Sequence, residues 1–225
     1  MVVHYSGLVA NMKKIRSICK RYKLALIEDA AHSIGARYEN CLIGSFNNFC
    51  CFSFQAIKHI NTGDGGMLTF NNKNYLEKAK RMRFFGLSRE LPRLKNNIKQ
   101  LGYKYEMNQI TASIGIEQMK DLKKVILTYK RNAKILINGL KKNKNIIICE
   151  SSKNSDPSYW MLSILTNNKE KIQRELFKNG IQSGQVHKRN DIHLIYSKSK
   201  KKLKNLDSVY PRLLHLPCGW WLTKK

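Results

Sequence analysis

Two apolar segments joined by a polar, glycine-rich turn place the strongest constraint on this sequence. Residues 48–54 (Asn-Phe-Cys-Cys-Phe-Ser-Phe) form an apolar run of the length typical of a buried strand. The residues 63–66 (Gly-Asp-Gly-Gly) predict a turn, and residues 67–70 predict a second strand. Lys58 lies between the two strands, and burial there would lower the pKa of its amine and make it a nucleophile. The alternative is a solvated loop lysine, which is common in a lysine-rich chain.

A strand–helix–strand unit precedes this stretch. Residues 2–5 predict a short strand, residues 11–22 a helix that its first residue, an asparagine, can cap, and residues 24–27 a buried strand that leads to Asp29. Such a unit predicts a mostly parallel sheet with a right-handed crossover. Because sites in parallel sheets lie beyond the carboxyl ends of the strands, Asp29 and Ser53 mark the expected site.

The rest of the chain predicts further helices and a smaller α+β domain. We place the boundary within a helical stretch, which gives a large domain over residues 1–125 and a small domain over residues 126–225. The expected helices cover 72–82, 108–119, 122–140 and 169–179, and the expected later strands cover 146–149, 159–165 and 181–186.

The formal net charge of +27 raises the hypothesis of nucleic-acid binding. The lysines are spread along the chain, however, and only residues 198–204 form a dense basic run, which is typical of a solvated surface segment. Nucleic acid is therefore an unfavoured partner, although a positive field would attract a nucleotide-diphosphate substrate.

Several other classes of protein are disfavoured. None of the six cysteines forms a Cys-x-x-Cys pair, so no metal site is predicted, and no apolar run has the length of a membrane span. The first residues do not form a targeting peptide, and we expect a cytoplasmic protein.

Several motifs, in order, resemble the DegT/DnrJ/EryC1/StrS aminotransferase family. The first is Ser53-Phe-x-x-x-Lys58 followed by Gly-Asp-Gly-Gly, and the second is Leu26-Ile-Glu-Asp-Ala-Ala-His-Ser33, whose Asp29 lies 29 positions before Lys58. Further similar segments are residues 102–108, 112–115 and 216–223. The resemblance implies an aspartate-aminotransferase-like, fold type I α/β enzyme that uses pyridoxal 5'-phosphate (PLP) to aminate nucleotide-linked keto-sugars, with glutamate as the expected amino donor.

The resemblance also implies roles for single residues. Lys58 would carry the cofactor and act as the catalytic base, and Asp29 would keep the pyridine nitrogen protonated. His32 would contact the cofactor ring, and Ser53 would bind its phosphate. The alternatives are a strand-end cap for Asp29, a core histidine for His32 and a backbone-bonded serine for Ser53.

Three more residues are singled out by the resemblance, and the first of them departs from the family pattern. Lys104 stands where many members carry an asparagine that reaches the cofactor phosphate of the neighbouring subunit, which implies a homodimer. His187 and His193 lie in a segment similar to the substrate-binding loop of the small domain, although they can equally be surface histidines.

Family members carry further chain before the equivalent of Val2, including a helix N-terminus that binds the cofactor phosphate. We therefore expect a C-terminal part of the family chain, with an incomplete large domain and exposed apolar surface. A non-catalytic remnant or interaction protein is the second hypothesis, and a basic nucleic-acid-binding protein is the third.

Overall fold

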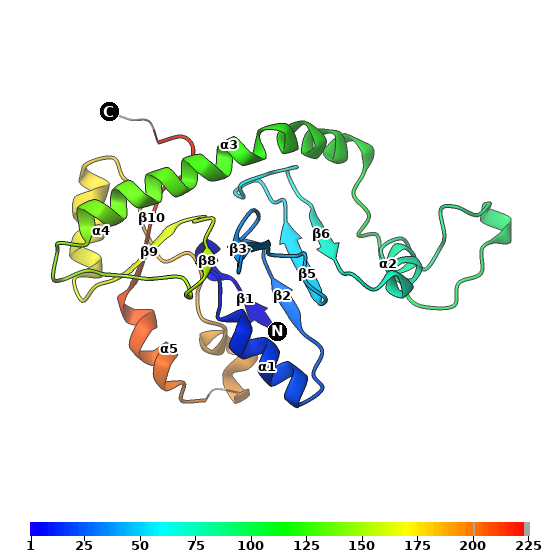
Figure 1. The fold of residues 1–225 in the computed structure, drawn as a ribbon, viewed down its shortest axis with the longest axis horizontal. Helices are drawn as coiled ribbons and strands as arrows, with labels where there is room; N and C mark the ends of the chain where they lie inside the picture. The colour runs from blue at the N-terminus through cyan, green and yellow to red at the C-terminus, as the bar shows by residue number, and fades with distance from the viewer. Residues whose placement is uncertain (200, 223–225) are drawn as a thin grey trace.

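The main sheet carries the predicted strand–helix–strand unit. The computed structural model describes residues 1–199 and 201–222, and its main sheet has four strands in the order β1-β2-β5-β6. Strands β1, β2 and β5 are parallel, and β6 is antiparallel to β5, so the predicted mostly parallel sheet is confirmed (Figure 1). The bounds are β1 (Val2–Val3), β2 (Ile27–Asp29), β5 (Phe49–Ser53) and β6 (Gly66–Thr69).

Helix α1 (Met12–Arg21) connects β1 to β2 and agrees with the predicted helix. The side chain of Asn11 accepts a hydrogen bond from the amide of Lys14, which caps the helix. Met12 at its start is fully buried and packs in one core with Cys50 of β5. Cys51 is exposed, because successive side chains on a strand point to opposite faces.

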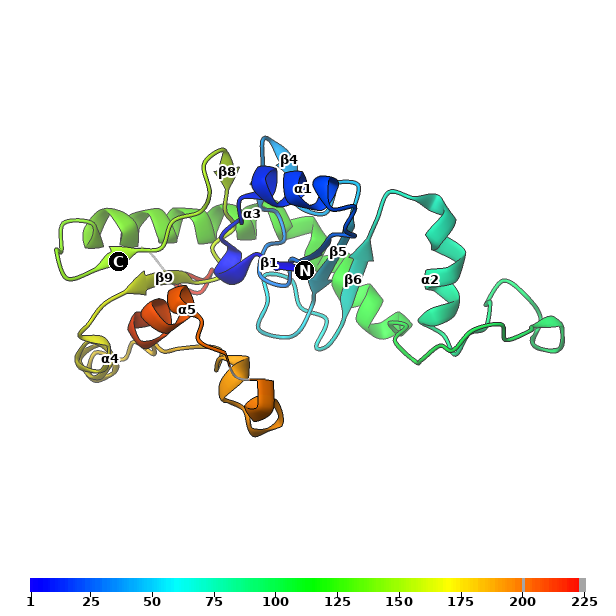
Figure 2. The same ribbon diagram turned by 90° about the horizontal axis from the view of Figure 1, so that it is seen from below.

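A short helical segment and a long excursion follow β6. The segment comprises η2 (Lys73–Tyr75) and α2 (Leu76–Met82). Residues 83–107, which include η3 (Arg93–Lys95), then extend away from the body beyond α2 (Figures 1 and 2). A bridge between Phe84 and Lys104 closes the base of this excursion.

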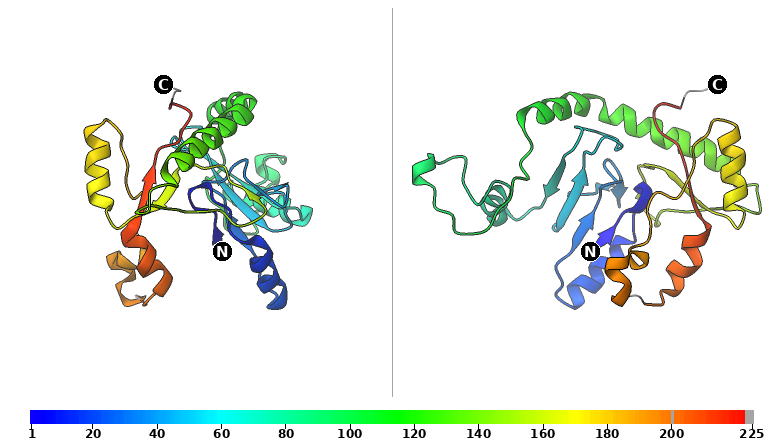
Figure 3. Two further views of the ribbon diagram at one scale, coloured as in Figure 1. Left: turned by 60° about the vertical axis from the view of Figure 1, so that its left-hand side comes forward. Right: turned by 180° about the vertical axis from the view of Figure 1, so that it is seen from behind.

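Helix α3 (Gln109–Leu140) is one continuous helix of 32 residues. Two helices were predicted here, and that prediction is wrong because no proline interrupts the segment, while Gly115 inside it packs against Thr62. Asn108 caps the helix by accepting from the amide of Thr111. The helix runs from above the main sheet to the region of β9 and α4 (Figures 1 and 3). The expected domain boundary at 125/126 falls inside this helix and stays a prediction.

The C-terminal part contains a second, antiparallel sheet in the order β10-β9-β7, covered by α3 and α4. Its core is formed by Leu162, Ile164 and Leu214, which pack against Leu136 of α3. The bounds are β7 (Ile147–Ile148), β9 (Leu162–Leu165), β10 (Leu213–Leu216), α4 (Lys169–Lys178) and α5 (Lys204–Val209), with the short helices η4 (Asn190–Ile192), η5 (Leu194–Ser199) and η6 (Tyr210–Arg212).

The expected strand at 181–186 is wrong. Only an isolated bridge between Gly184 and His215 forms there, because the segment meets the open edge of β10 at that single residue pair. In the basic run at 198–204, residue 200 lies outside the described residues, as does Thr223 of the C-terminal motif.

A third, small sheet joins the two parts of the chain. Its order is β4-β3-β8, so β8 (Ser155–Asp156) from the C-terminal part pairs with β3 (Arg37–Tyr38), which in turn pairs with β4 (Cys41–Leu42). Among the described residues, no helix is both long and apolar enough to cross a bilayer.

Candidate functional site

The carboxyl ends of the three parallel strands place polar residues side by side. His4 follows β1, and its amide donates to the carbonyl of Asp29, the last residue of β2. The amide of Ala30 donates to the carbonyl of Cys51 in β5, so the ladder continues to this edge. The site therefore lies where parallel sheets generally bind their ligands.

Lys58 lies in a fixed turn after β5. The amide of Lys58 donates to the carbonyl of Gln55 at 2.9 Å, and the amide of Thr62 donates to that of Phe54 at 2.8 Å. The amide group of Gln118 on α3 bonds the backbone of Asn61 twice, at 3.0 and 2.7 Å. These hydrogen bonds fix the backbone before and after Lys58, so its side chain projects from a defined position.

The Lys58 amine lies in a partly buried, aromatic environment. Its Nζ lies 4.1 Å from the centre of the Trp160 ring. Burial lowers the pKa of Lys58, and the carboxylate of Asp29 acts in the opposite direction. A lysine with a lowered pKa has more of its amine in the neutral, nucleophilic form.

Asp29 presents one free carboxylate oxygen. Its Oδ1 accepts from the amide of Ala31 at 3.0 Å, whereas Oδ2 has no hydrogen-bond partner among the described residues. The residue is partly exposed. Asp29 can thus accept a charged or protonated partner without breaking its local turn.

His32 is buried and held as a neutral ring. Its Nδ1 accepts from the amide of Ser6 at 3.2 Å, and its ring stacks on Trp160 at 3.9 Å and on His187 at 5.5 Å. Burial lowers the pKa of His32 to about 3, with smaller contributions from the charge of Lys58 and from neighbouring histidines. The ring can therefore stack or accept a hydrogen bond without adding charge to the site.

His187 lies at the rim and Tyr5 behind it. The two rings meet edge-on at 5.9 Å, and the pKa of His187 is lowered by burial and by Lys58. The hydroxyl of Tyr5 bonds Nε2 of His215 at 2.9 Å, and the hydroxyl of Ser163 bonds Nδ1 of the same ring at 3.0 Å. Burial raises the pKa of Tyr5 to about 12 and lowers that of His215 to about 4, so both are neutral at pH 7.

The other residues singled out in the sequence make no side-chain hydrogen bond to this group in the described part of the chain. Ser53 ends β5, and its Oγ accepts from the amide of Gln55 at 3.3 Å. Lys104 is exposed at the base of the excursion and donates to the carbonyl of Glu106. His193 is exposed between η4 and η5. The structure thus brings together Asp29, His32, Lys58 and His187 and leaves Lys104 and His193 outside the group.

Four residues in or beside the group were missed in the sequence: Tyr5, His59, Trp160 and His215. His59 is buried, packs edge-on against Tyr129, and bonds the carbonyl of Ser158 through Nε2 at 3.2 Å. Burial lowers its pKa to about 4. Of these four residues, only His59 lies next to a predicted site residue in the sequence, because it directly follows Lys58.

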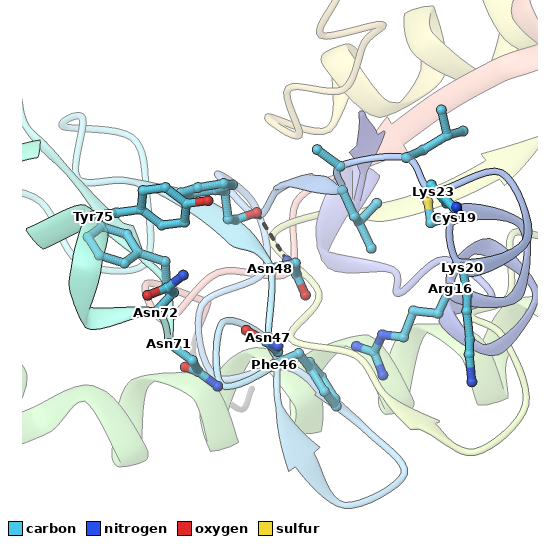
Figure 4. A pocket seen from close by; sticks show the side chains of 15 residues that line it. Arg16, Cys19, Lys20, Lys23, Phe46, Asn47, Asn48, Asn71, Asn72 and Tyr75 are labelled. Atoms are coloured by element: carbon cyan, nitrogen blue, oxygen red, sulfur yellow. Dashed lines mark hydrogen bonds between the residues drawn. The ribbon is translucent and has the colours of Figure 1, made fainter. Parts of the chain in front are cut away.

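Two cavities lie away from the group of Asp29, His32, Lys58 and His187. A basic pocket of about 580 Å³ at the amino ends of β2 and β5 is lined by Arg16, Lys20 and Asn48, and none of the Lys58 group faces it (Figure 4). An apolar groove of about 1050 Å³ lies between β6, α2 and the start of α3, with Met67 and Met119 exposed in its wall. Within the described part of the chain, no group of three potential ligands could hold a metal ion.

Comparison with known proteins identifies the family of the chain and relatives with the same fold. The model of the DegT/DnrJ/EryC1/StrS aminotransferase family matches residues 1–225. The UDP-4-amino-4,6-dideoxy-N-acetyl-beta-L-altrosamine transaminase of Campylobacter jejuni is 29% identical over 96% of this chain and 59% of its own length.

Two solved structures extend the match to the fold. AtS13 from Actinomadura melliaura is 31% identical with a TM-score of 0.95, covering 99% of this chain and 62% of its own. The sugar aminotransferase CalS13 from Micromonospora echinospora is 26% identical with a TM-score of 0.95, covering 99% and 63%. The predicted fold class is confirmed, and the chain spans about three fifths of the length of these relatives.

Proposed function

Because the chain belongs to the DegT/DnrJ/EryC1/StrS aminotransferase family, we propose that it carries the lysine-bearing part of a PLP-dependent aminotransferase site. The observation that supports this proposal most directly is the half-buried amine of Lys58, beside Asp29 and His32 at the carboxyl edge of the sheet. The proposed reaction moves an amino group from glutamate onto a keto-sugar carried by a nucleotide diphosphate.

The residues present fit the cofactor. Asp29 has a carboxylate oxygen free to pair with a protonated pyridine nitrogen. Ser53 accepts a hydrogen bond from Gln55, so its own proton remains available for a phosphate oxygen. His32 offers a neutral ring on the same side of the site as Lys58. PLP, when bound, supplies an electron sink for negative charge that develops at a substrate carbon.

Lys58, Asp29 and His32 would then have different roles in the reaction. Lys58 Nζ would form the covalent link to the cofactor and, when free, would carry a proton to and from the substrate carbon. Its lowered pKa supports both roles, because each requires the neutral amine. The Asp29 carboxylate would keep a proton on the pyridine nitrogen, and neutral His32 would leave that pairing undisturbed.

The substrate class is proposed from the relatives, one of which has a name that specifies a UDP-amino-sugar transaminase. The net charge of +27 supports an anionic substrate, since a positive field raises its local concentration. We further propose a homodimer in which Lys104, on its excursion, reaches the phosphate of the partner's cofactor. The cytoplasmic location and the substrate-side roles of His187 and His193 stay predictions.

Borohydride trapping tests the role of Lys58. The chain is incubated with PLP, reduced and digested, and we expect the pyridoxyl label on the peptide that contains Lys58. Lys58→Ala should lose the label, whereas Lys20→Ala, a change at an exposed lysine of α1, should keep it. Asp29→Asn should keep labelling but lose most turnover.

A pyridoxyl label on another lysine, with Lys58→Ala still active in transamination, would overturn the proposal. Full turnover of Asp29→Asn would reject the role given to the carboxylate. Tight DNA binding with a steep salt dependence and no label would instead favour a basic nucleic-acid-binding protein.

A further inference from the structure

We propose that Trp160 is a positioning residue that fixes the turn of Lys58 and provides the resting place of its amine. This inference rests on the proposed role of Lys58. Trp160 lies just before β9, 102 positions along the chain from Lys58, and is 5% exposed. Its indole combines a hydrogen bond, a cation contact and a ring stack, all directed at the candidate site.

The indole N–H anchors the backbone next to the lysine. Nε1 of Trp160 donates to the carbonyl of Ile57 at 2.8 Å. On the other side of Lys58, the ring of His59 bonds the carbonyl of Ser158 at 3.2 Å. The residues before and after the lysine are thus tied to one short segment, and only the Lys58 side chain remains free to move.

The indole face meets the amine itself. Lys58 Nζ lies 4.1 Å from the ring centre, within the range of a cation–π contact, which favours the protonated amine. Burial favours the neutral amine, so the two effects oppose one another. The indole therefore holds the ammonium form at a defined position, while burial keeps the pKa of Lys58 below the ordinary lysine value.

The segment that carries the indole is itself tightly held. Gly7 has a φ of +85°, and a Cβ there would lie 2.6 Å from the amide nitrogen of Tyr159 and 2.7 Å from that of Trp160. Ser158 donates from its amide to the Gly7 carbonyl and from its hydroxyl to the His32 carbonyl. The stack of Trp160 on His32 at 3.9 Å completes the support. Because the indole is fixed by these contacts, it can position the flexible Lys58 side chain. Lys58 could position the indole only if other contacts held the lysine.

Fluorinated tryptophans test the ring contact without changing its shape. Tryptophan analogues with one, two and four ring fluorines are placed at position 160 of the full chain by codon suppression. The pKa of Lys58 is then measured by trace acetylation with acetic anhydride across pH, with peptide mass spectrometry and Lys20 as the internal reference. We expect the pKa to fall stepwise by about 0.5 in all, or about 0.7 kcal/mol at 1.36 kcal/mol per pKa unit.

Trp160→Phe tests the anchor, because it keeps a ring face and removes the N–H. Hydrogen exchange of the amides of Lys58 and Thr62 should become about fivefold faster, and Trp220→Phe, at an exposed tryptophan, should change neither exchange nor the Lys58 pKa. A flat Lys58 pKa across the fluorine series would overturn the ring contact, and unchanged exchange in Trp160→Phe would overturn the anchor. Neither readout requires the cofactor, so a failure here is separate from a failure of the borohydride label.

Discussion

Replacing His215 by glutamine should remove a defined part of the acid sensitivity of the fold. His215 is 2% exposed, and its two nitrogens bond the hydroxyls of Tyr5 and Ser163. A hydroxyl can donate or accept, so both bonds suit a neutral ring, and the amide of glutamine can replace at least one of them. Burial lowers the pKa of His215 from 6.5 to about 4.

The lowered pKa of His215 decides in which direction the stability of the fold changes with pH. In the unfolded chain His215 takes up a proton as the pH falls through about 6.5, whereas in the folded chain it stays neutral until about pH 4. Stability from this residue is therefore fully present above pH 7 and is lost as the pH falls between these values. Lowering the pH from 7 to 5 should remove about 2 kcal/mol of the free energy of unfolding through His215 alone.

His32 and His59 act in the same direction, because burial lowers their pKa values to about 3 and about 4. The parent chain should thus lose up to about 6 kcal/mol over the same interval, and His215→Gln up to about 4 kcal/mol. The measurement is urea unfolding at pH 7 and pH 5, followed by circular dichroism. The difference between the two pH values is compared, so a constant cost of the substitution cancels.

The matched control is His193→Gln, at an exposed histidine, which should lose as much stability as the parent. If His215→Gln also loses as much as the parent, to within about 0.5 kcal/mol, His215 titrates alike in the folded and unfolded chains and the argument from burial is wrong.

Three other predictions concern the assembly, the backbone and the surface. Mixed dimers of Lys58→Ala and Lys104→Ala chains, each completed to the length of the relatives, should regain activity from one intact site, and proven subunit exchange without recovery would contradict a shared site. Gly7→Ala should lower the free energy of unfolding in urea by about 2–4 kcal/mol, because the new Cβ would lie 2.6 Å from a backbone nitrogen. Gly180 has a similar φ but open space around it, so Gly180→Ala should lower that free energy by only about 1 kcal/mol, and equal losses would refute the contact argument. The apolar groove should bind a hydrophobic dye, and Met67→Lys should weaken that binding severalfold; unchanged dye binding would place the exposed apolar surface elsewhere.

Local patterns in the sequence were sufficient for most of the main sheet. The cap at Asn11, the apolar run that becomes β5 and the strand that ends at Asp29 are each recognised from a few consecutive residues. Because parallel strands share a carboxyl edge, the placement of Asp29 and Ser53 at one edge of the sheet could be predicted from the strand ends.

Contacts over long sequence distances could not be predicted. Trp160 meets Lys58 across 102 positions and Tyr5 meets His215 across 210, and no periodicity relates such pairs. The expected strand at 181–186 failed for a related reason, because apolar residues there do not reveal that the segment meets the edge of β10 only at Gly184. The break expected near residue 120 failed because polar residues on a helix resemble a short linker.

Helix α3 connects the part of the chain that holds Lys58 to the part that holds His215. Its 32 residues correspond to about 48 Å at 1.5 Å per residue, so a bend of about 5° at its midpoint would move its far end by about 2 Å. Gln118, in the first half, holds the turn of Lys58, while Leu136, in the second half, packs on the sheet that contains His215. If the C-terminal part were to move towards Lys58, this helix would have to bend or its contacts at one end would have to change. The elastic resistance of one helix would then be part of the free energy of closing the site.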